Sequence, residues 1–526
     1  MVRSQYRPPL PLLLPEVEYR YQQSMARVLT ARLLSLGARC MSSRRAHYLV
    51  LAFVLLLAAL IRTVPLTYSH FWDETVFLQH AKVIIDGRTN YEEFHHRPPF
   101  LSFLYALGFA IWDNVYVANL VQGVVTALTV VFGFLYARRG FGLTAALFSG
   151  FLFAFTPYFV EASHELLTDM PALALMLAAM WLFDKAGARY AFLSGILYAL
   201  AIQTRFTSLF LVVYFALDAI LSPKKIRSLA FLLAGAALAI SPYLIWIRWN
   251  YGSFFYPFVQ ARRIVTEWTA PVPAGFYWEA LLEVFPYSMW LFFGAGVLLP
   301  VAHGAMQRRA REDGGRLTGL AGLSDRTKRE FVLLMWGGAF FTYMLSIPHK
   351  EVRYLLPLAI PVVVISALGL AEMFRWCARQ ARPVKTSGIV LGIAVVMLDY
   401  APSLQELSEP WLDRSEREEV QIGRYLHEVS TPADTIYAAH NFPVFAFYSE
   451  RRTVSLLPIQ GEFDQAWREL MKQPGFLVYY HPAGIEETHS IYPSFKPDEK
   501  FLETNPNFHR IRAFPSAVIY RYEPPR

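Results

Sequence analysis

The chain has 526 residues, of which 55% are hydrophobic and only 17% are charged, and its mean hydropathy is +0.31. This composition is typical of a protein that crosses a lipid bilayer many times, and it excludes a single compact soluble domain. The formal net charge of +8 does not indicate a nucleic-acid partner, because the lysines and arginines gather in short loops beside apolar runs, where membrane topology accounts for them. The two cysteines, Cys40 and Cys377, form neither a metal-ligand pattern nor a disulfide framework.

The first part of the chain sets the expected orientation. Residues 1–45 are rich in arginine, and they contain no signal peptide because their one apolar patch is short and broken by Pro11. Since such segments stay in the cytoplasm, the first apolar run, 48–60, is expected to lead out of it. The polar stretch 68–100 then lies outside, and the apolar run 100–112 is too short for a span of about 20 residues. We expect that run to form an interfacial or re-entrant helix; were it a span, every later loop would change sides.

The later apolar runs alternate with basic loops in a way that fits this orientation. Lys and Arg follow every second span, as expected on the cytoplasmic side. We expect about 11 spans, an inside N-terminus and an outside C-terminus. The expected spans after the first are 115–136, 141–158, 170–183, 192–202, 206–221, 229–246, 285–301, 331–347, 354–370 and 388–398.

From Pro402 the pattern changes to that of a soluble α/β domain. Alternating or continuous short apolar runs predict strands there, and helical spacing predicts helices. The expected helices are 415–429 and 463–471, and the expected strands are 435–439, 475–480 and 517–522. The predicted organisation is therefore a cytoplasmic segment at 1–45, an α-helical polytopic membrane bundle at 46–401, and a small external α/β domain at 402–526.

Four polar clusters are expected on the external face, and Arg205 joins them. The clusters are Asp73-Glu74, His95-His96-Arg97, Glu165 with Asp169, and His349-Lys350-Glu351-Val352-Arg353. A charge moved toward the bilayer centre costs about 2.5 to 3.5 kcal/mol, so an acidic pair beside a span is either an interfacial accident or a site. Each cluster alone has an ordinary explanation, such as a helix cap at Asp169 or interfacial anchors at the basic residues. Their convergence on one face favours a site.

Three motifs follow one another along residues 45–400. They are the acidic pair after the first span, His-x-Arg-Pro-Pro at 95–99 and Thr-Asp-Met-Pro at 168–171. In this order they resemble the GT-C glycosyltransferases, above all the protein O-mannosyltransferases and the aminoarabinose transferases that modify lipid A, where a lysine usually stands in place of Arg97. His-Lys-Glu-x-Arg-Tyr at 349–354 is similar instead to a motif of the lipid-linked mannosyltransferases. The resemblance therefore implies a GT-C-like bundle but leaves the subfamily open.

The activity implied by the resemblance is transfer of a sugar, with inversion, from a polyprenyl-phosphate donor to a hydroxyl group. The acceptor is a protein, a lipid or a glycan, and the reaction takes place at the external face of a membrane, most simply the plasma or inner membrane. A carboxylate that is ionised at neutral pH can accept the acceptor's proton. Asp73 is the candidate for this role, and Glu74 and Asp169 are expected to assist it.

Cations are expected to hold the departing lipid phosphate. Arg97 is the first candidate, because its guanidinium fork matches phosphate oxygens. The other phosphate candidates are Lys350, Arg353 and Arg205, and the remaining pocket residues are His95, His96, Glu165, His349 and Glu351. The sequence specifies no cofactor. Histidines near carboxylates are compatible with a divalent metal, although they lack the paired spacing of a helical metal site.

Two other interpretations compete with an enzyme. A transporter or flippase of lipid-linked saccharides would use the polar clusters to line a path, and it predicts ionisable residues within the spans. The apolar runs are nearly free of them. A non-catalytic receptor or scaffold would use the C-terminal domain as its binding module. The identities of the sugar and of the acceptor do not follow from the sequence.

Overall fold

The computed structural model divides into two compact units, Met1–Leu56 and Leu57–Arg526. Apart from the start of helix α2 (Arg44–Thr63), all the elements below belong to the second unit. The residues that the structure describes are 44–64, 72–86, 97–185, 187–267, 272–273, 275–309, 324–412, 416–438, 441–456, 467–480 and 499–525.

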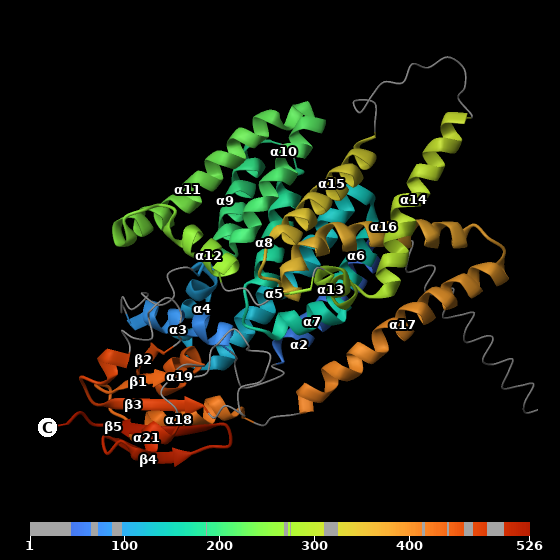
Figure 1. Ribbon diagram of the computed structural model, residues 1–526. Coiled ribbons are helices and arrows are strands. Elements are labelled where there is room, and N and C mark those ends of the chain that lie inside the picture. The colour runs from blue at the N-terminus through green and yellow to red at the C-terminus, as the bar shows by residue number, and fades with distance from the viewer. Residues whose placement is uncertain are drawn as a thin grey trace, which may run out of the picture. The chain divides into compact units, whose positions relative to one another are not determined.

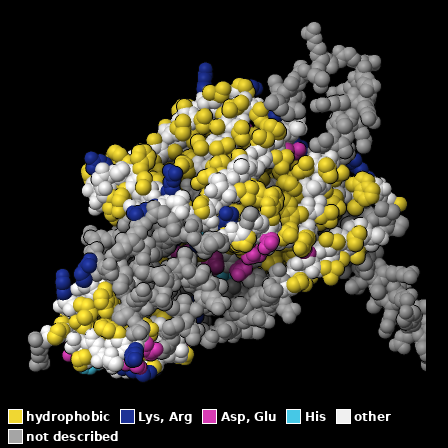
Figure 2. Space-filling view, in the orientation of Figure 1, with side chains coloured by type: hydrophobic (Ala, Val, Ile, Leu, Met, Phe, Trp, Pro, Cys, Tyr) yellow, Lys and Arg dark blue, Asp and Glu magenta, His cyan; other side chains and the backbone are white. Residues whose placement is uncertain are grey.

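The second unit consists mainly of helices, with one sheet near its end (Figure 1). Many large apolar side chains of these helices are exposed, and hydrophobic side chains spread over the helical face that is in view (Figure 2). The helices before the sheet are α3 (Trp72–Asp86), α4 (Phe100–Ile111), α5 (Val115–Phe141), α6 (Leu143–Phe155), α7 (Pro157–His164), α8 (Asp169–Phe183), α9 (Ala188–Thr204), η1 (Phe206–Phe210), α10 (Leu211–Leu221), η2 (Pro223–Lys225), α11 (Ile226–Tyr251), α12 (Tyr256–Glu267), α13 (Phe276–Val284), α14 (Tyr287–Arg309), α15 (Asp325–Ser346), η4 (Val352–Leu358), α16 (Ala359–Ala378) and α17 (Arg382–Leu412).

Within the described residues, three helical segments are long and apolar enough to cross a membrane: Val115–Phe141, Pro223–Tyr251 and Val352–Ala378. Two bent pairs, α6 with α7 and α13 with α14, raise the number to five if each pair is one span. The apolar helices α4, α8 and α10 are shorter than this. The long apolar helices support a membrane bundle, and the count of about 11 spans stays a prediction.

The run expected as a single span at 141–158 is broken in the structure. Helices α6 and α7 meet at an angle of 53°, because Pro157 lacks an amide hydrogen and disfavours the helical conformation of Thr156 before it. The buried guanidinium of Arg62 donates to the carbonyl oxygens of Phe153 at 2.8 Å and Ala154 at 2.9 Å. The end of α2 thereby satisfies the carbonyl groups at the break, and helix α7 turns toward the segment 165–168.

Two pairs of helices approach each other at reciprocal glycines. A Cβ atom added at Gly195 of α9 would lie 1.9 Å from the Leu232 carbonyl oxygen of α11, and one added at Gly235 of α11 would lie 2.0 Å from the Phe192 carbonyl oxygen of α9. Helices α14 and α16 meet in the same way around Gly369. Small residues at such crossings let helix backbones pack closely where lipid provides no hydrophobic driving force between helices.

The C-terminal part is an α/β domain, as expected. Its sheet has the strand order β2-β1-β3-β5-β4, in which β1 is parallel to β2 and β3 while β5 is antiparallel to β3 and β4. The elements are α18 (Glu418–Val429), β1 (Thr435–Ala438), α19 (Phe442–Ser449), β2 (Arg452–Ser455), β3 (Gly475–Tyr480), α21 (Glu499–Thr504), β4 (Phe508–Ala513) and β5 (Ala517–Tyr522). Three of these strands and α18 agree with the prediction, whereas β2, β4, α19 and α21 were missed. Of the expected helix 463–471, residues 463–466 lie outside the described residues and 467–470 are helical. Helix α17 runs through the expected domain boundary at residue 402.

The α/β domain packs directly on helix α3. Trp72 and Val76 of α3 belong to the same apolar core as Phe442 and Phe445 of α19, and the Trp72 and Phe442 rings meet edge to face with centroids 5.0 Å apart. The first residues of α3 are therefore held between the membrane helices and the domain, which fixes the position of the neighbouring Asp73.

Candidate functional site

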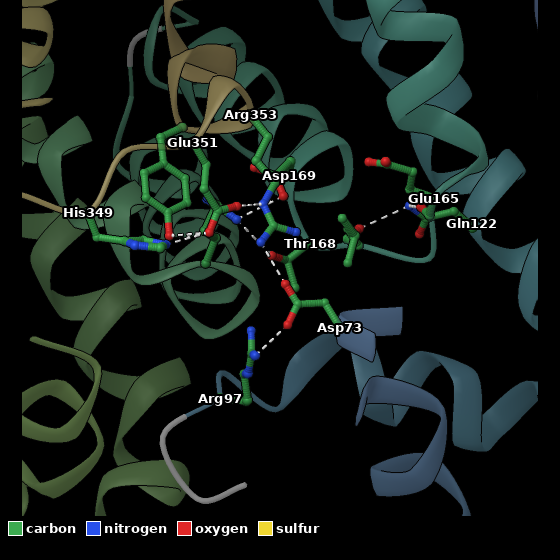
Figure 3. A network of polar contacts seen from close by, with 12 residues as sticks. Asp73, Arg97, Gln122, Glu165, Thr168, Asp169, His349, Glu351 and Arg353 are labelled. Atoms are coloured by element: carbon green, nitrogen blue, oxygen red, sulfur yellow. Dashed lines mark hydrogen bonds and ion pairs between the residues drawn. The ribbon is translucent and has the colours of Figure 1, made fainter. Parts of the chain in front are cut away.

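An aspartate at the start of α3 lies between two arginines from distant parts of the chain (Figure 3). The Nη2 atom of Arg97, just before α4, donates to Oδ1 of Asp73 at 2.5 Å. The Nη2 atom of Arg353, in the 3-10 turn η4, donates to Oδ2 of Asp73 at 2.6 Å. The segment that contains Arg97 and the late motif at 349–354 therefore meet at one carboxylate.

These two arginines decide the charge of Asp73. Burial would raise the pKa of this carboxyl, but the charges of Arg97 and Arg353 and the hydrogen bonds from both outweigh it and hold the pKa well below its usual range. Asp73 is therefore ionised at any physiological pH. While both ion pairs are intact it is a poor proton acceptor, because an efficient general base has a pKa nearer to neutrality.

Glu351 holds Arg353 from its other side. It accepts a hydrogen bond from the Arg353 Nε atom, and it also bonds Nε2 of His349 at 2.8 Å and the Tyr354 hydroxyl at 3.0 Å. Burial favours the neutral acid, but the hydrogen bonds from His349 and Arg353 and the Arg353 charge lower the pKa of Glu351 to about 2. The motif at 349–354 therefore uses its own carboxylate to orient its arginine toward Asp73.

A second ion pair lies beside the first. Oδ2 of Asp169, at the start of α8, accepts from Nη1 of Arg205 at 2.8 Å, and the same Nη1 atom donates to Oγ1 of Thr168 at 3.2 Å. The guanidinium of Arg205 lies 5.1 Å from the centroid of the Tyr354 ring. Asp169 does not cap α8 with its side chain, because the residue before that helix is Thr168. Figure 3 shows Asp169 next to the guanidinium of Arg353.

Three buried polar atoms of this site have no hydrogen-bond partner. They are Oδ1 of Asp169, Nε of Arg205 and Nε of Arg97. Buried polar groups in folded proteins are nearly always hydrogen-bonded, so several unpaired donors and acceptors in one place indicate a missing partner. A polar ligand with both donor and acceptor groups would provide the missing bonds.

The other acidic residues of the clusters act on the backbone or face the surface. Glu74 is 7% exposed, and its Oε1 atom accepts the backbone amide of Leu166 at 2.8 Å. Residue Glu165 is exposed to solvent. Lys350 turns to the carbonyl oxygen of Ile347 at 3.2 Å. His95 and His96 lie outside the residues that the structure describes.

Gln122 of α5 is a residue that the sequence analysis missed. Its Nε2 atom donates to the carbonyl oxygens of Glu165 at 2.6 Å and Leu167 at 3.0 Å, and its Oε1 atom accepts from the Tyr105 hydroxyl at 2.9 Å. The side chain is 1% exposed. An amide side chain within the apolar run 115–136, whose only amide residues are Asn119 and Gln122, was the signal available in the sequence, because a polar side chain at that depth needs partners.

The described residues contain no group of three or more His, Cys, Asp or Glu side chains that could hold a metal ion. The chemistry of the described site is instead that of paired carboxylates and guanidinium groups. Such a set of residues matches an anionic phosphate and the hydroxyl groups of a sugar.

The chain is similar to known proteins in sequence over one segment and in fold over most of its length. The family model for dolichyl-phosphate-mannose-protein mannosyltransferase matches residues 96–246. No curated protein sequence gives a significant match.

Solved structures match over most of the chain. The crystal structure of ArnT from Cupriavidus metallidurans bound to undecaprenyl phosphate has a TM-score of 0.61 and 14% sequence identity, with 90% of this chain and 97% of that chain covered. The apo state of the same ArnT has a TM-score of 0.61 and 15% identity, with the same coverage. The archaeal oligosaccharyltransferase AglB from Archaeoglobus fulgidus, in complex with an inhibitory peptide and a dolichol-phosphate, has a TM-score of 0.56 and 14% identity, with 85% of this chain and 70% of that chain covered.

Proposed function

We propose that this chain, which has the fold of the GT-C membrane glycosyltransferases, transfers a sugar from a polyprenyl-phosphate donor to a hydroxyl acceptor on a protein, a lipid or a glycan. The observation that carries the proposal is the placement of Asp73 between Arg97 and Arg353. A base for the acceptor and cations for the donor phosphate are the two requirements of this reaction, and the three side chains supply both at one point.

The arginines act on the leaving group. As the bond between the anomeric carbon and the phosphate oxygen breaks, its electron pair moves to the lipid phosphate, which gains negative charge. Cationic donors fixed at that position stabilise the transition state more than the ground state, and one such donor is worth about 2.7 to 4 kcal/mol. Arg97 is the first candidate because its Nε atom is buried without a partner, and Arg353 is the second.

Asp73 acts on the acceptor. The acceptor oxygen forms the new bond to the anomeric carbon from the face opposite the phosphate, so the configuration at that carbon inverts. The proton of the acceptor hydroxyl passes to the Asp73 carboxylate. A donor phosphate that draws Arg97 or Arg353 away from Asp73 weakens the interactions that hold its pKa down. Binding of the donor thereby makes Asp73 a stronger base when it is needed.

The proposal includes a side of the membrane. Nucleotide sugars are cytoplasmic, whereas a lipid-linked donor can present its sugar on the far face. The basic loops expected in the cytoplasm, including Arg139 and Lys225, contact Asp184 at the carboxyl end of α8, while Asp169 begins that helix. With the positive-inside rule, these contacts support the proposal that the Asp73 site and the α/β domain lie outside.

The test uses the full chain in lipid nanodiscs with a panel of radiolabelled polyprenyl-phosphate sugars. We expect the wild-type protein to consume one of these donors and the Asp73→Asn variant to lose this activity, because the amide keeps the shape but accepts no proton. Asp325→Asn, at an exposed position that begins α15, is the matched control and keeps the wild-type rate.

Two results would contradict the proposal. Full donor consumption by Asp73→Asn would remove Asp73 from the role of base. Failure of the wild-type protein to consume any sugar of the panel, with either a peptide or a glycolipid acceptor present, would overturn the assigned activity.

A further inference from the structure

A cavity of about 880 Å³ lies between helix α3, the turn from α4 to α5, and the α/β domain. Its wall includes Gln79 and Lys82 of α3, Asn119 of α5, and Glu450 and Arg452 of the domain. Pockets that bind small ligands commonly have volumes of about 300 to 1,000 Å³ and a few placed polar groups. The cavity has the size and polarity of a binding site, and the proposed transfer reaction does not account for it.

This cavity is separate from the site around Asp73. An α-helix has 3.6 residues per turn, so Lys82 is about two and a half turns beyond Asp73 and points to the opposite side of α3. The Phe77 ring, which shares the side of Asp73, lies 5.9 Å from the guanidinium of Arg97. Helix α3 therefore has the arginine site on one side and the cavity on the other.

The basic side chains on the cavity wall already have partners. A phosphate at these basic side chains would compete with the partners that they hold, and none of them has a buried unpartnered nitrogen like Nε of Arg97. The pairs and bonds are Lys82 with Asp113, Arg424 with Glu416 at 3.0 Å, Arg452 with Glu469 at 2.9 Å, and Arg451 with the Ser430 hydroxyl at 3.0 Å and the His427 carbonyl oxygen at 3.1 Å. The wall is therefore poorly suited to a free anion.

The same wall suits a neutral ligand that both donates and accepts hydrogen bonds. Hydroxyl groups do both, and they can bond to the spare lone pairs and N–H groups of side chains that are already paired. Gln79 and Asn119 add amide groups, and the partly exposed Tyr116 and Tyr448 add aromatic surface. These are the groups that recognise a sugar ring, which has polar edges and less polar faces.

We propose that this cavity binds a neutral saccharide unit of the acceptor, one that is not the unit receiving the new sugar. The inference rests on the proposed function, since that function requires a hydroxyl acceptor. It also gives the α/β domain a role, because the domain supplies the wall of the cavity that faces α3. The acceptor is accordingly a glycan or a glycolipid with several sugar units rather than a bare protein hydroxyl.

Glu450 is a suitable position for a variant that tests this proposal. Its φ of 55° is in the left-handed region, where glycine is favoured over a residue with a side chain. Glu450→Gly therefore removes one carboxylate from the cavity at a backbone position that suits the replacement. Asn441, with a φ of 52°, is the other such non-glycine residue in the described chain. It does not appear in the cavity wall, so Asn441→Gly is the matched control.

The experiment compares these variants as full chains in nanodiscs. We expect Glu450→Gly to raise the acceptor KM for a glycolipid about tenfold, because the acceptor loses one hydrogen bond to a charged group. The donor KM should not change to match. Asn441→Gly should change neither constant. An unchanged acceptor KM in Glu450→Gly would overturn the inference.

Direct binding separates this inference from the proposed activity. Calorimetry with the neutral trisaccharide mannotriose and with inorganic phosphate needs no donor turnover. Mannotriose binding that is lost in Glu450→Gly but kept in Asn441→Gly supports a saccharide site, even if no donor is ever consumed. Phosphate binding that shows the same loss would instead identify an anion site and overturn the assigned ligand class.

Discussion

Arg353 connects two carboxylates, and its geometry makes it the least replaceable residue of the site. Its Nη2 atom bonds Asp73 and its Nε atom bonds Glu351, so two different nitrogens of one planar guanidinium group are in use. A lysine has a single ammonium group and cannot reproduce this arrangement. The residue acts through its shape as much as through its charge.

We therefore expect Arg353→Lys to lower kcat/KM for the donor about 10²- to 10³-fold, the loss typical of one transition-state donor. The measurement is steady-state consumption of a radiolabelled lipid-phosphate sugar. Arg375→Lys is the control, because Arg375 is a half-exposed partner of Glu372 on α16. If the variant with lysine at position 353 consumed the donor at the wild-type rate, the guanidinium geometry of Arg353 would not be needed.

The carboxylates of the site also predict a pH dependence of stability. Glu351 has its pKa lowered from 4.5 to about 2 in the folded chain. A group with a lowered folded-state pKa stabilises the fold above its unfolded-state pKa, and this contribution is lost as the pH falls toward the folded-state value. The contribution of Glu351 is therefore complete above pH 4.5 and declines between pH 4.5 and 2.

We expect the thermal unfolding temperature in detergent to fall over this window, and to fall less steeply in Glu351→Gln, whose amide does not titrate. The measurement is a set of unfolding curves between pH 6 and pH 3. Glu428→Gln, at an exposed position of α18, should follow the wild-type curve. Identical slopes for the wild type and Glu351→Gln would contradict the charge state assigned to Glu351.

At the scale of elements, the segment 165–168 between α7 and α8 is held from three directions. Gln122 of α5 binds its carbonyl groups, and Glu74 of α3 binds the Leu166 amide. Just before it, Nε2 of His164 bonds the Ile61 carbonyl oxygen of α2 at 2.7 Å. Asp169 directly follows this segment, so the position of the segment determines where the Asp169 carboxylate meets Arg205.

Gln122→Met keeps the volume of the side chain and removes its hydrogen bonds. Leaving the carbonyl oxygens of Glu165 and Leu167 unpaired should cost about 1 to 3 kcal/mol of stability each. We also expect a lower kcat in the folded protein, because Asp169 loses its support. Gln380→Met, at a partly exposed position, is the control. A stability loss with an unchanged kcat would limit Gln122 to a structural role.

At the scale of the whole bundle, a second network of buried charges lies at the opposite end of α8 from Asp169. Asp184, 3% exposed, bonds Lys225 at 2.8 Å and also bonds Arg329, and Lys225 bonds Asp218 at 2.6 Å. The loops after α5, α8 and α10 and the start of α15 converge here. The basic loops that the sequence assigned to one side of the membrane therefore share one end of the bundle.

Asp184→Asn leaves these cations without a full counter-charge. Breaking a buried ion pair at one partner costs about 3 to 5 kcal/mol, so we expect a clear loss of unfolding free energy and of expression. The kcat of the protein that does fold should not change, since the network is distant from Asp73. Asp325→Asn, exposed and near the same end of α15, is the control. A specific loss of kcat would instead couple this end of the bundle to the site.

Features that depend on local composition and periodicity could be predicted from the sequence. The long apolar runs specified helices, alternating runs specified strands β1, β3 and β5, and the charged motifs marked Asp73, Arg97, Asp169 and Arg353 as candidates. Each of these signals is read over a few neighbouring residues. The expected span 141–158 did not include the break at Pro157, whose exposed carbonyl groups are bonded by Arg62.

Which of the candidate site residues contact one another depends on the fold. Asp73 and Arg353 are 280 positions apart, and no local pattern states that they form an ion pair or that Lys350, three positions before Arg353, turns away. The same holds for the cavity behind α3, whose walls come from three separate stretches of chain. A side chain's partners and its pKa depend on groups that the fold brings near, and distance in space is not encoded in distance along the chain.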